Sequence, residues 1–223
     1  MPLLPLTPAA LAARIAAAAV PAATAAGGQG HGLRLAVEGP VAADATALAD
    51  AVGAALTDLA VPVARVRGDE FLRARSLRLE HGPADPDAFF EGWYDLASLR
   101  REVLDPLGPG GTMRWLTGLR DPVTDRPLRR PRADAPPGAV AVVDGRFFAR
   151  WEVADAVDLL VHLEVTPAAR ARRVPADEHA RVLPAWEQYL QWHDPASSAA
   201  YVVRADRPTH PALVVERPVT VAR

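Results

Sequence analysis

The chain has 223 residues and contains neither cysteine nor lysine. The absence of cysteine excludes disulfides, thiolate metal sites and cysteine nucleophiles. All 25 residues of the Lys and Arg group are arginines, so no lysine is available to hold a phosphate group. The net charge of −2 and the pI near 6.3 argue against a general nucleic-acid binder, and we expect a small-molecule partner.

Long apolar runs are also missing. No stretch of about 18 uninterrupted apolar residues exists, so the sequence predicts no membrane span. The alanine-rich start lacks the basic segment of a signal peptide, which makes a targeting segment the less favoured alternative. Thr7 and Pro8 instead predict the start of a helix over residues 9–20, before a glycine-rich linker at 27–30. We expect a cytoplasmic protein with an N-terminal helix and linker (1–30) and one main domain (31–223).

The apolar pattern predicts an α/β fold. Half of the residues are hydrophobic, which is enough for the core of one such domain. An apolar run at 33–38 ends in a glycine turn, a helix starts at Asp44 and a strand follows at 62–66, which together form a βαβ unit. Later strands are expected at 139–143, 159–165 and 201–204, with an edge strand at 213–216. These elements predict a three-layer fold with a mainly parallel five-stranded sheet flanked by helices.

The segments between these strands are expected to be helical or irregular. Residues 67–92 predict a loop with short helical turns at most, and residues 108–137 predict an irregular segment. A helix over 95–104 should stop at Asp105-Pro106. Thr166-Pro167 predicts the cap of another helix. A further helix over 177–192 contains Pro184, which should kink or divide it.

The segment from Gly39 to Thr46 has the layout of a phosphate-binding P-loop in which two residues are replaced. Asp44 and Ala45 stand where the motif GxxxxGKT has Gly and Lys. Asp44 is interpreted either as an N-cap of the following helix or as a functional residue such as a metal ligand, and the cap is favoured. A carboxylate about 4 Å from a phosphate charge costs on the order of 4 kcal/mol at an effective dielectric near 20, so ATP binding in the standard pose is disfavoured.

A set of segments along the chain resembles the bacterial, actinobacterial-type uridine kinase-like P-loop proteins. The resemblance covers about residues 33–216 and implies a P-loop NTPase-like fold in which ATP phosphorylates the 5′-hydroxyl of a pyrimidine nucleoside. Its most specific part is the segment Leu-Asp-Pro-Leu-Gly-Pro-Gly-Gly. The segments that carry it are Val37-Glu-Gly39, Gly68-Asp69-Glu-Phe71-Leu-Arg73, Trp93-Tyr94-Asp95-Leu96, Leu104 to Gly111, Val142-Val-Asp-Gly145 and the Arg170 to Arg173 cluster.

The resemblance implies a role for individual residues on the substrate side. Asp69 would accept the proton of the nucleoside hydroxyl, as the base does in other kinases, although a loop cap is the alternative. Phe71 and Tyr94 would line the nucleoside pocket, or else are ordinary core aromatics. Thr46 and Asp144 would handle magnesium, although Asp-Gly after a strand is also a common turn.

The phosphate side would combine the loop with a group of arginines. Gly39, Asp44, Ala45 and Thr46 form the nucleotide-binding candidate, and Arg170, Arg172 and Arg173 resemble lid arginines that neutralise the transferring phosphoryl group. A solvated helix face is the other interpretation of these arginines.

Two functions therefore stay open at the level of the sequence. The first is a uridine kinase-like phosphotransferase that uses Mg²⁺ and ATP on a nucleoside or a similar small hydroxyl compound. The second is a catalytically inactive kinase homologue with a binding or regulatory role and no cofactor. The histidines show no metal-binding spacing and the serines no GxSxG motif, so neither a histidine metal site nor a serine hydrolase is supported. The pattern gives no oligomeric state.

Overall fold

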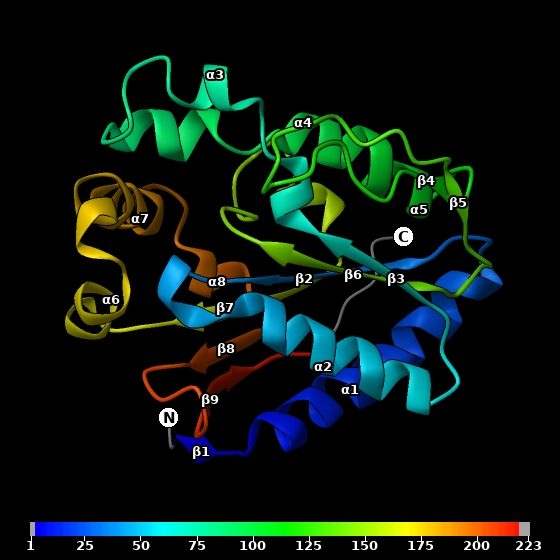
Figure 1. Ribbon diagram of the computed structural model, residues 1–223. Helices are drawn as coiled ribbons and strands as arrows, with labels where there is room; N and C mark the ends of the chain where they lie inside the picture. Colours follow the sequence, from blue (N-terminus) through cyan, green and yellow to red (C-terminus); the bar gives the residue numbers. More distant parts are fainter. Residues whose placement is uncertain (1–2, 219–223) are drawn as a thin grey trace.

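The computed structural model describes residues 3–218, and it places a central sheet between two layers of helices (Figure 1). The strands of this sheet are β1 (Leu4–Pro5), β2 (Leu33–Glu38), β3 (Val63–Arg67), β6 (Val140–Gly145), β7 (Leu159–Glu164), β8 (Tyr201–Arg204) and β9 (Ala212–Glu216). The seven strands follow the order β1-β9-β8-β7-β2-β6-β3. The expected mainly parallel sheet is confirmed by β8, β7, β2, β6 and β3, which are parallel to one another. Two antiparallel strands, β9 and β1, extend it at one edge.

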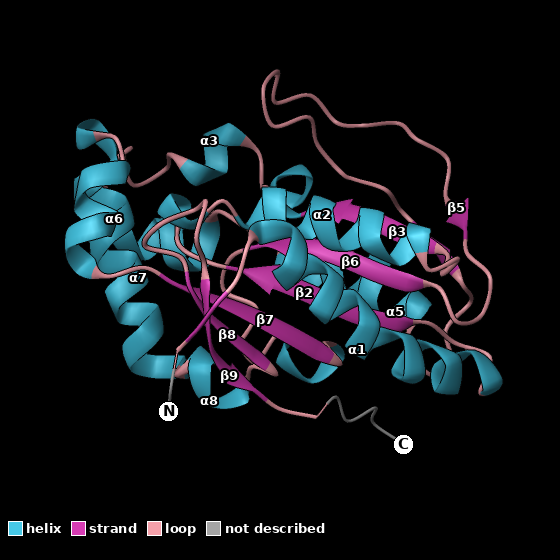
Figure 2. Cartoon of the chain, turned by 90° about the horizontal axis from the view of Figure 1, so that it is seen from below, coloured by secondary structure: helices cyan, strands magenta, loops and turns pink. Residues whose placement is uncertain are grey.

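Two helices cover one face of the sheet. They are α1 (Pro8–Gly28) and α2 (Ala45–Asp58), which pack on each other and on the strands, as Figure 2 shows from that side. The buried strand residues Leu35, Val37 and Val161 share a core cluster with Ile15 and Leu56 on this face. The alternation of side chains along each strand explains why one set of residues faces these helices and the next set faces the opposite layer.

The opposite layer is built from shorter helices. These are α3 (Arg75–Arg78), α4 (Leu96–Leu99), α5 (Asp105–Leu107), α7 (His179–His193) and α8 (Pro195–Ser198), and α6 (Pro167–Arg173) follows directly on the carboxyl end of β7. A small hairpin of β4 (Arg114–Trp115) and β5 (Ala133–Asp134) lies beside α5. The core of this layer is rich in aromatic side chains, including Phe90, Phe147 and Trp186.

The first helix is longer than expected. It was predicted over residues 9–20 but continues past Pro21 to Gly28, because Ala22, Ala23 and Ala26 are buried against the sheet side and their packing offsets the backbone bond that Pro21 cannot make. It is also the one helix within residues 3–218 that is long and apolar enough to cross a membrane, with a mean hydropathy of 1.5 over an 18-residue window. Its apolar face is packed in the core of the protein. The segment 1–30 therefore supplies a strand and a helix to the same layers as the main domain.

Three other helix predictions need correction. The helical run that begins at Leu96 continues through Pro106 to Leu107, since a wider π-type turn over Arg100–Leu104 directly precedes the proline. The helix α7 begins at His179, two residues later than expected, and runs through Pro184 without being divided, while a kink at this proline stays a prediction. Thr166 precedes α6 as expected, but its side chain makes no cap and donates instead to Asp206 Oδ1 at 2.9 Å.

Candidate functional site

The junction between β2 and α2 has the expected strand, turn and helix. After Glu38 the chain turns at Gly39, where a Cβ atom would lie only 2.8 Å from the Cβ of Ala43 and 2.9 Å from that of Leu163. This close approach requires glycine at position 39. A short 3₁₀ turn over Val41–Ala43 leads to Asp44, and α2 begins at Ala45.

Asp44 folds back onto the helix that it precedes. Its Oδ1 accepts a hydrogen bond from the backbone N–H of Ala47 at 3.2 Å. The backbone of Asp44 lies in the left-handed region, with φ 54° and ψ 52°, which Asp tolerates better than most residues. In a P-loop, the free N–H groups and the dipole of this helix end would hold a phosphate. Here a carboxylate of the protein bonds one of these N–H groups, and the methyl side chain of Ala45 adds no charge.

The two predicted magnesium residues lie together. Thr46, in the first turn of α2, donates its hydroxyl hydrogen to Asp144 Oδ2, and Asp144 lies near the carboxyl end of β6 with 4% exposure. The sequence did not point to their third neighbour, Arg65 of β3. Its Nη1 lies 2.6 Å from Asp144 Oδ1, and its Nε lies 2.8 Å from Asp50 Oδ1.

The charges around Asp144 form an alternating chain. Asp50, on α2, accepts hydrogen bonds from Arg65 and also from Arg67 Nη2, at 3.0 Å. Burial alone would raise the pKa of Asp50, but the hydrogen bonds from Arg65 and Arg67 outweigh it and hold this pKa below its usual value. Asp144, Arg65, Asp50 and Arg67 therefore neutralise one another.

This donor set does not fit a magnesium ion. Mg²⁺ prefers an octahedral shell of oxygens, usually from carboxylates, phosphates and water. Asp144, the buried carboxylate of this set, accepts the Thr46 hydroxyl on Oδ2, and its Oδ1 forms an ion pair with the Arg65 guanidinium, although that oxygen accepts no hydrogen bond. Within residues 3–218, no group of three or more His, Cys, Asp and Glu side chains is placed to hold a metal ion. ATP fits no better, because the helix end that would hold its phosphates carries the Asp44 carboxylate.

A second constellation lies at the carboxyl end of β3. Asp69 Oδ1 accepts a hydrogen bond from the Tyr94 hydroxyl at 2.8 Å and one from Arg146 Nη1 at 3.1 Å. The guanidinium of Arg146 also contacts the Tyr94 hydroxyl, and it lies 5.6 Å from the centre of the Tyr94 ring. The side chain of Asp69 is 48% exposed, so its carboxylate is accessible to a ligand. The structure thus brings Asp69 and Tyr94 together.

Phe71 is a core residue, like Tyr94 and unlike the exposed Asp69. It is 1% exposed and belongs to the core cluster on the aromatic face of the sheet. Arg146, by contrast, was missed by the sequence analysis, although it follows Asp144-Gly145 at the end of a strand. The local signal was a charged residue directly after a strand-end glycine.

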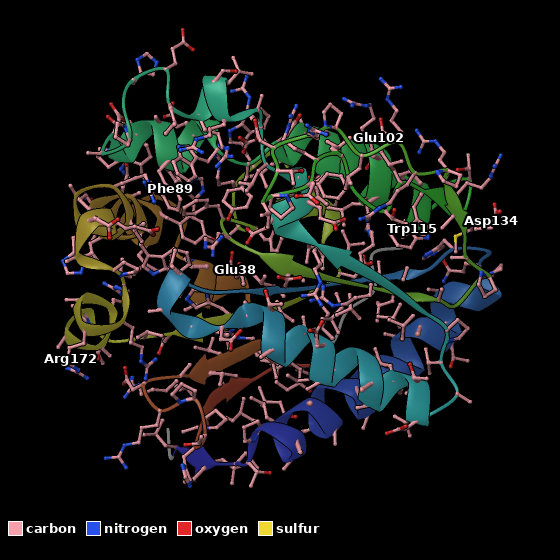
Figure 3. The ribbon with its side chains drawn as sticks, viewed as in Figure 1. Glu38, Phe89, Glu102, Trp115, Asp134 and Arg172 are labelled. Carbon is pink, nitrogen blue, oxygen red and sulfur yellow. The ribbon has the colours of Figure 1, made fainter. Side chains whose placement is uncertain are left out.

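The three arginines of α6 have different surroundings. Arg170 is buried, donates to the carbonyl of Val165 at 2.8 Å and pairs with Glu187. Arg173 donates to the carbonyl oxygens of Ala42, at 3.1 Å, and of Ala205, at 2.9 Å, and also contacts that of Asp206. Arg172 is exposed and lies at the outer edge of the molecule (Figure 3).

Glu38 is a buried carboxylate directly before the loop, near the carboxyl end of β2 (Figure 3). It accepts hydrogen bonds from the Tyr189 hydroxyl at 2.7 Å and from the Phe148 N–H at 2.7 Å, and it lies 2.9 Å from His162 Nδ1. Burial, and then the charge of Glu38, raise the pKa of Tyr189 well above its usual value. The sequence signal was an acidic residue at the end of an apolar strand. This network ties β2, β7 and α7 together behind the loop.

The fold, a mainly parallel sheet between two layers of helices, matches that of solved P-loop kinases. Among solved structures, the chain is similar to a possible uridine kinase from Bacillus stearothermophilus, with a TM-score of 0.64 and 19% identity over 76% of this chain and 87% of that one. A D-glycerate 3-kinase from Cryptococcus neoformans var. grubii has a TM-score of 0.59 and 12% identity, over 89% and 97% of the two chains. A candidate fructose transport system kinase from a Silicibacter species has a TM-score of 0.56 and 19% identity, over 84% and 91%.

No family model and no curated protein matches the sequence. The three structural neighbours are described as a possible uridine kinase, a candidate fructose transport system kinase and a glycerate kinase. At identities of 12–19% they show the fold, and the chemistry of this chain has to be argued from its own residues.

Proposed function

We propose that this protein is a uridine kinase-like homologue that binds a nucleoside or a similar hydroxyl-bearing small molecule and does not transfer a phosphoryl group from ATP. The observation that carries the proposal is the hydrogen bond from the Ala47 N–H to Asp44 Oδ1, which places a carboxylate at the phosphate end of α2. A charge repulsion of about 4 kcal/mol at this position corresponds to roughly a thousandfold loss of ATP affinity. Phosphoryl transfer depends on positioning and charge stabilisation, so this loss removes the basis of catalysis.

The small-molecule site is Asp69 with Tyr94 and Arg146. An exposed carboxylate, fixed by a phenol and a guanidinium, is suited to accept a hydrogen bond from a ligand hydroxyl. We further propose a binding or regulatory role in the cytoplasm that uses no cofactor.

Isothermal titration with ATP and Mg²⁺ tests the first half of this proposal. We expect no saturable binding to the wild-type protein and measurable binding to the double variant Asp44→Gly, Ala45→Lys, which removes the carboxylate and supplies the missing cation. Saturable ATP binding by the wild-type protein would contradict the proposal.

Titration with a panel of nucleosides tests the second half. Asp69→Asn should weaken the binding of a hydroxyl ligand, and Asp87→Asn, an exposed position in the same part of the chain, should leave it unchanged. Equal affinities for the two variants would show that Asp69 does not contact the ligand.

The second candidate function is the phosphotransferase itself. It is favoured by the contact between Thr46 and Asp144 and by the exposed carboxylate of Asp69, which is available as a base. Arginines would then replace the lysine, and both Asp44 and Arg65 would have to leave their present partners. Nucleoside phosphorylation that depends on Asp69 would establish this function over the first.

A further inference from the structure

The position of Arg65 bears on the cation requirement of the β2–α2 junction. In working P-loop enzymes, the hydroxyl of the loop Ser or Thr and a strand-end Asp hold Mg²⁺. Thr46 and Asp144 are the matching pair here, and the nearest positive charge to them is the guanidinium of Arg65. The side chain of Arg65 is 22% exposed and that of Asp144 is 6% exposed, so the ion pair is largely shielded from water.

Several contacts fix the guanidinium in this place. Its Nη1 pairs with Asp144 Oδ1 and also donates to the carbonyl oxygen of Val142 at 3.2 Å, and its Nε donates to Asp50. These partners come from β6 and α2, the two elements that flank β3 at this point. Because these contacts already restrict the Arg65 side chain, its ion pair with Asp144 costs little additional conformational entropy. The pair therefore forms without any ligand.

We propose that Arg65 supplies, as a permanent part of the protein, the positive charge that a divalent cation supplies at this position in working P-loops. The β2–α2 junction therefore takes no Mg²⁺, and binding at the neighbouring Asp69 site is independent of divalent cations. This inference rests on the proposed function because it concerns the same edge of the sheet, but it is tested on the protein without any nucleoside or nucleotide.

A latent cation site follows from the same geometry. Arg65→Gln removes the charge between Asp144 and Asp50. It leaves the Thr46 hydroxyl and the Asp144 carboxylate without a guanidinium partner, while Asp50 keeps its pair with Arg67. Arg67→Gln is the matched control, because Arg67 contacts Asp50 and leaves the pair of Arg65 with Asp144 intact. Arg65→Lys keeps a positive charge at the site.

Mn²⁺ binding, followed by electron paramagnetic resonance and by titration calorimetry with Mg²⁺, tests the inference on the full chain. We expect no stoichiometric Mn²⁺ site in the wild-type, Arg67→Gln and Arg65→Lys proteins. Arg65→Gln should bind one Mn²⁺ per chain, at least tenfold more tightly than any residual binding by the other three. The inference is overturned if Arg65→Gln folds without gaining a site, or if Arg67→Gln gains an equal one.

The wild-type measurement keeps the test decisive if Arg65→Gln does not fold. One Mn²⁺ bound per wild-type chain and lost in Asp144→Asn would overturn the inference, and its absence at millimolar Mn²⁺ would support it. Nucleoside titrations in EDTA and in Mg²⁺ are a separate arm. Equal nucleoside affinities support cation independence, whereas an Mg²⁺-dependent affinity overturns it, and a complete lack of nucleoside binding counts against the proposed function alone.

Discussion

At the scale of single residues, Asp44 combines two properties that are usually supplied by different side chains. Its left-handed backbone, with φ 54°, is a conformation in which glycine has no steric cost, and its carboxylate caps α2 through the Ala47 N–H. The replacement of glycine by aspartate at this position exchanges an open anion site for a capped helix. The substitution therefore acts on stability and on ligand binding in opposite directions.

A pair of substitutions at this residue separates the two properties. Asp44→Ala loses the cap, at about 1 kcal/mol, and puts an unfavourable side chain in the left-handed region, at about 1–2 kcal/mol more. Asp44→Gly loses the cap without that strain. We expect the free energy of unfolding, from urea denaturation, to fall by about 2–3 kcal/mol for alanine and by under about 1 kcal/mol for glycine. An alanine variant as stable as the glycine variant would show that the left-handed backbone is not retained.

At the scale of elements, the first helix is joined to the far edge of the sheet by side chains. Arg14 of α1 pairs with Glu216 of β9 at 2.5 Å, and Glu216 Oε1 also accepts a hydrogen bond from the Tyr201 hydroxyl of β8 at 3.2 Å. Burial, and then the charge of Glu216, raise the pKa of Tyr201 to about 12. The contact between α1 and the sheet edge therefore responds to alkaline pH.

The direction of this response follows from linkage. Tyr201 titrates near pH 10 in the unfolded chain and at about 12 in the folded protein, so between these values the unfolded state holds fewer protons. Stability is complete below pH 10 and is lost as the pH rises toward 12, by roughly 2–3 kcal/mol from this residue. Denaturation of the wild-type protein and of Tyr201→Phe at pH 9, 10, 11 and 12 should show a steeper loss for the wild type. Parallel curves would mean that the hydroxyl is not shielded.

The local elements were predictable because their signals are local. The apolar run at 33–38, the glycine turn and the helix after Asp44 are fixed by neighbours in sequence, and the structure contains each of them. Arg65 was missed although its strand has arginines at alternate positions, 65 and 67, which lie on one face. That face is covered by α2, and only the tertiary arrangement shows that Asp50 and Asp144 meet it there. The helix ends near Pro21 and Pro106 were misplaced because burial of the following alanines outweighed the first stop signal and a π-type turn accommodated the second proline.

At the scale of the whole molecule, the carboxyl edge of the sheet carries two groups of charged side chains that differ in their accessibility to a ligand. The strand ends at Asp69 and Arg146 present an accessible carboxylate with a fixed cation. At the ends of β2 and β6, by contrast, Asp44 and Arg65 engage the groups that would receive ATP and Mg²⁺. The strand, turn and helix of a P-loop are present, but the side chains at the start of α2 bind other groups of the protein. We therefore expect the loop at residues 39–46 to be held in place by contacts with the rest of the protein and not by a bound nucleotide.

Arg173 offers the sharpest test of this dependence, because it links three parts of the chain at once. From α6 it donates to the carbonyl of Ala42 in the loop and to those of Ala205 and Asp206 after β8. Hydrogen bonds from a charged donor contribute about 1.5–3 kcal/mol. Arg173→Gln should therefore lower the free energy of unfolding by about that much and speed amide hydrogen exchange in residues 40–46 and 205–211. Arg172→Gln, exposed on the same helix, should change neither quantity. If exchange accelerates equally in both variants, α6 and not the Arg173 guanidinium holds the loop.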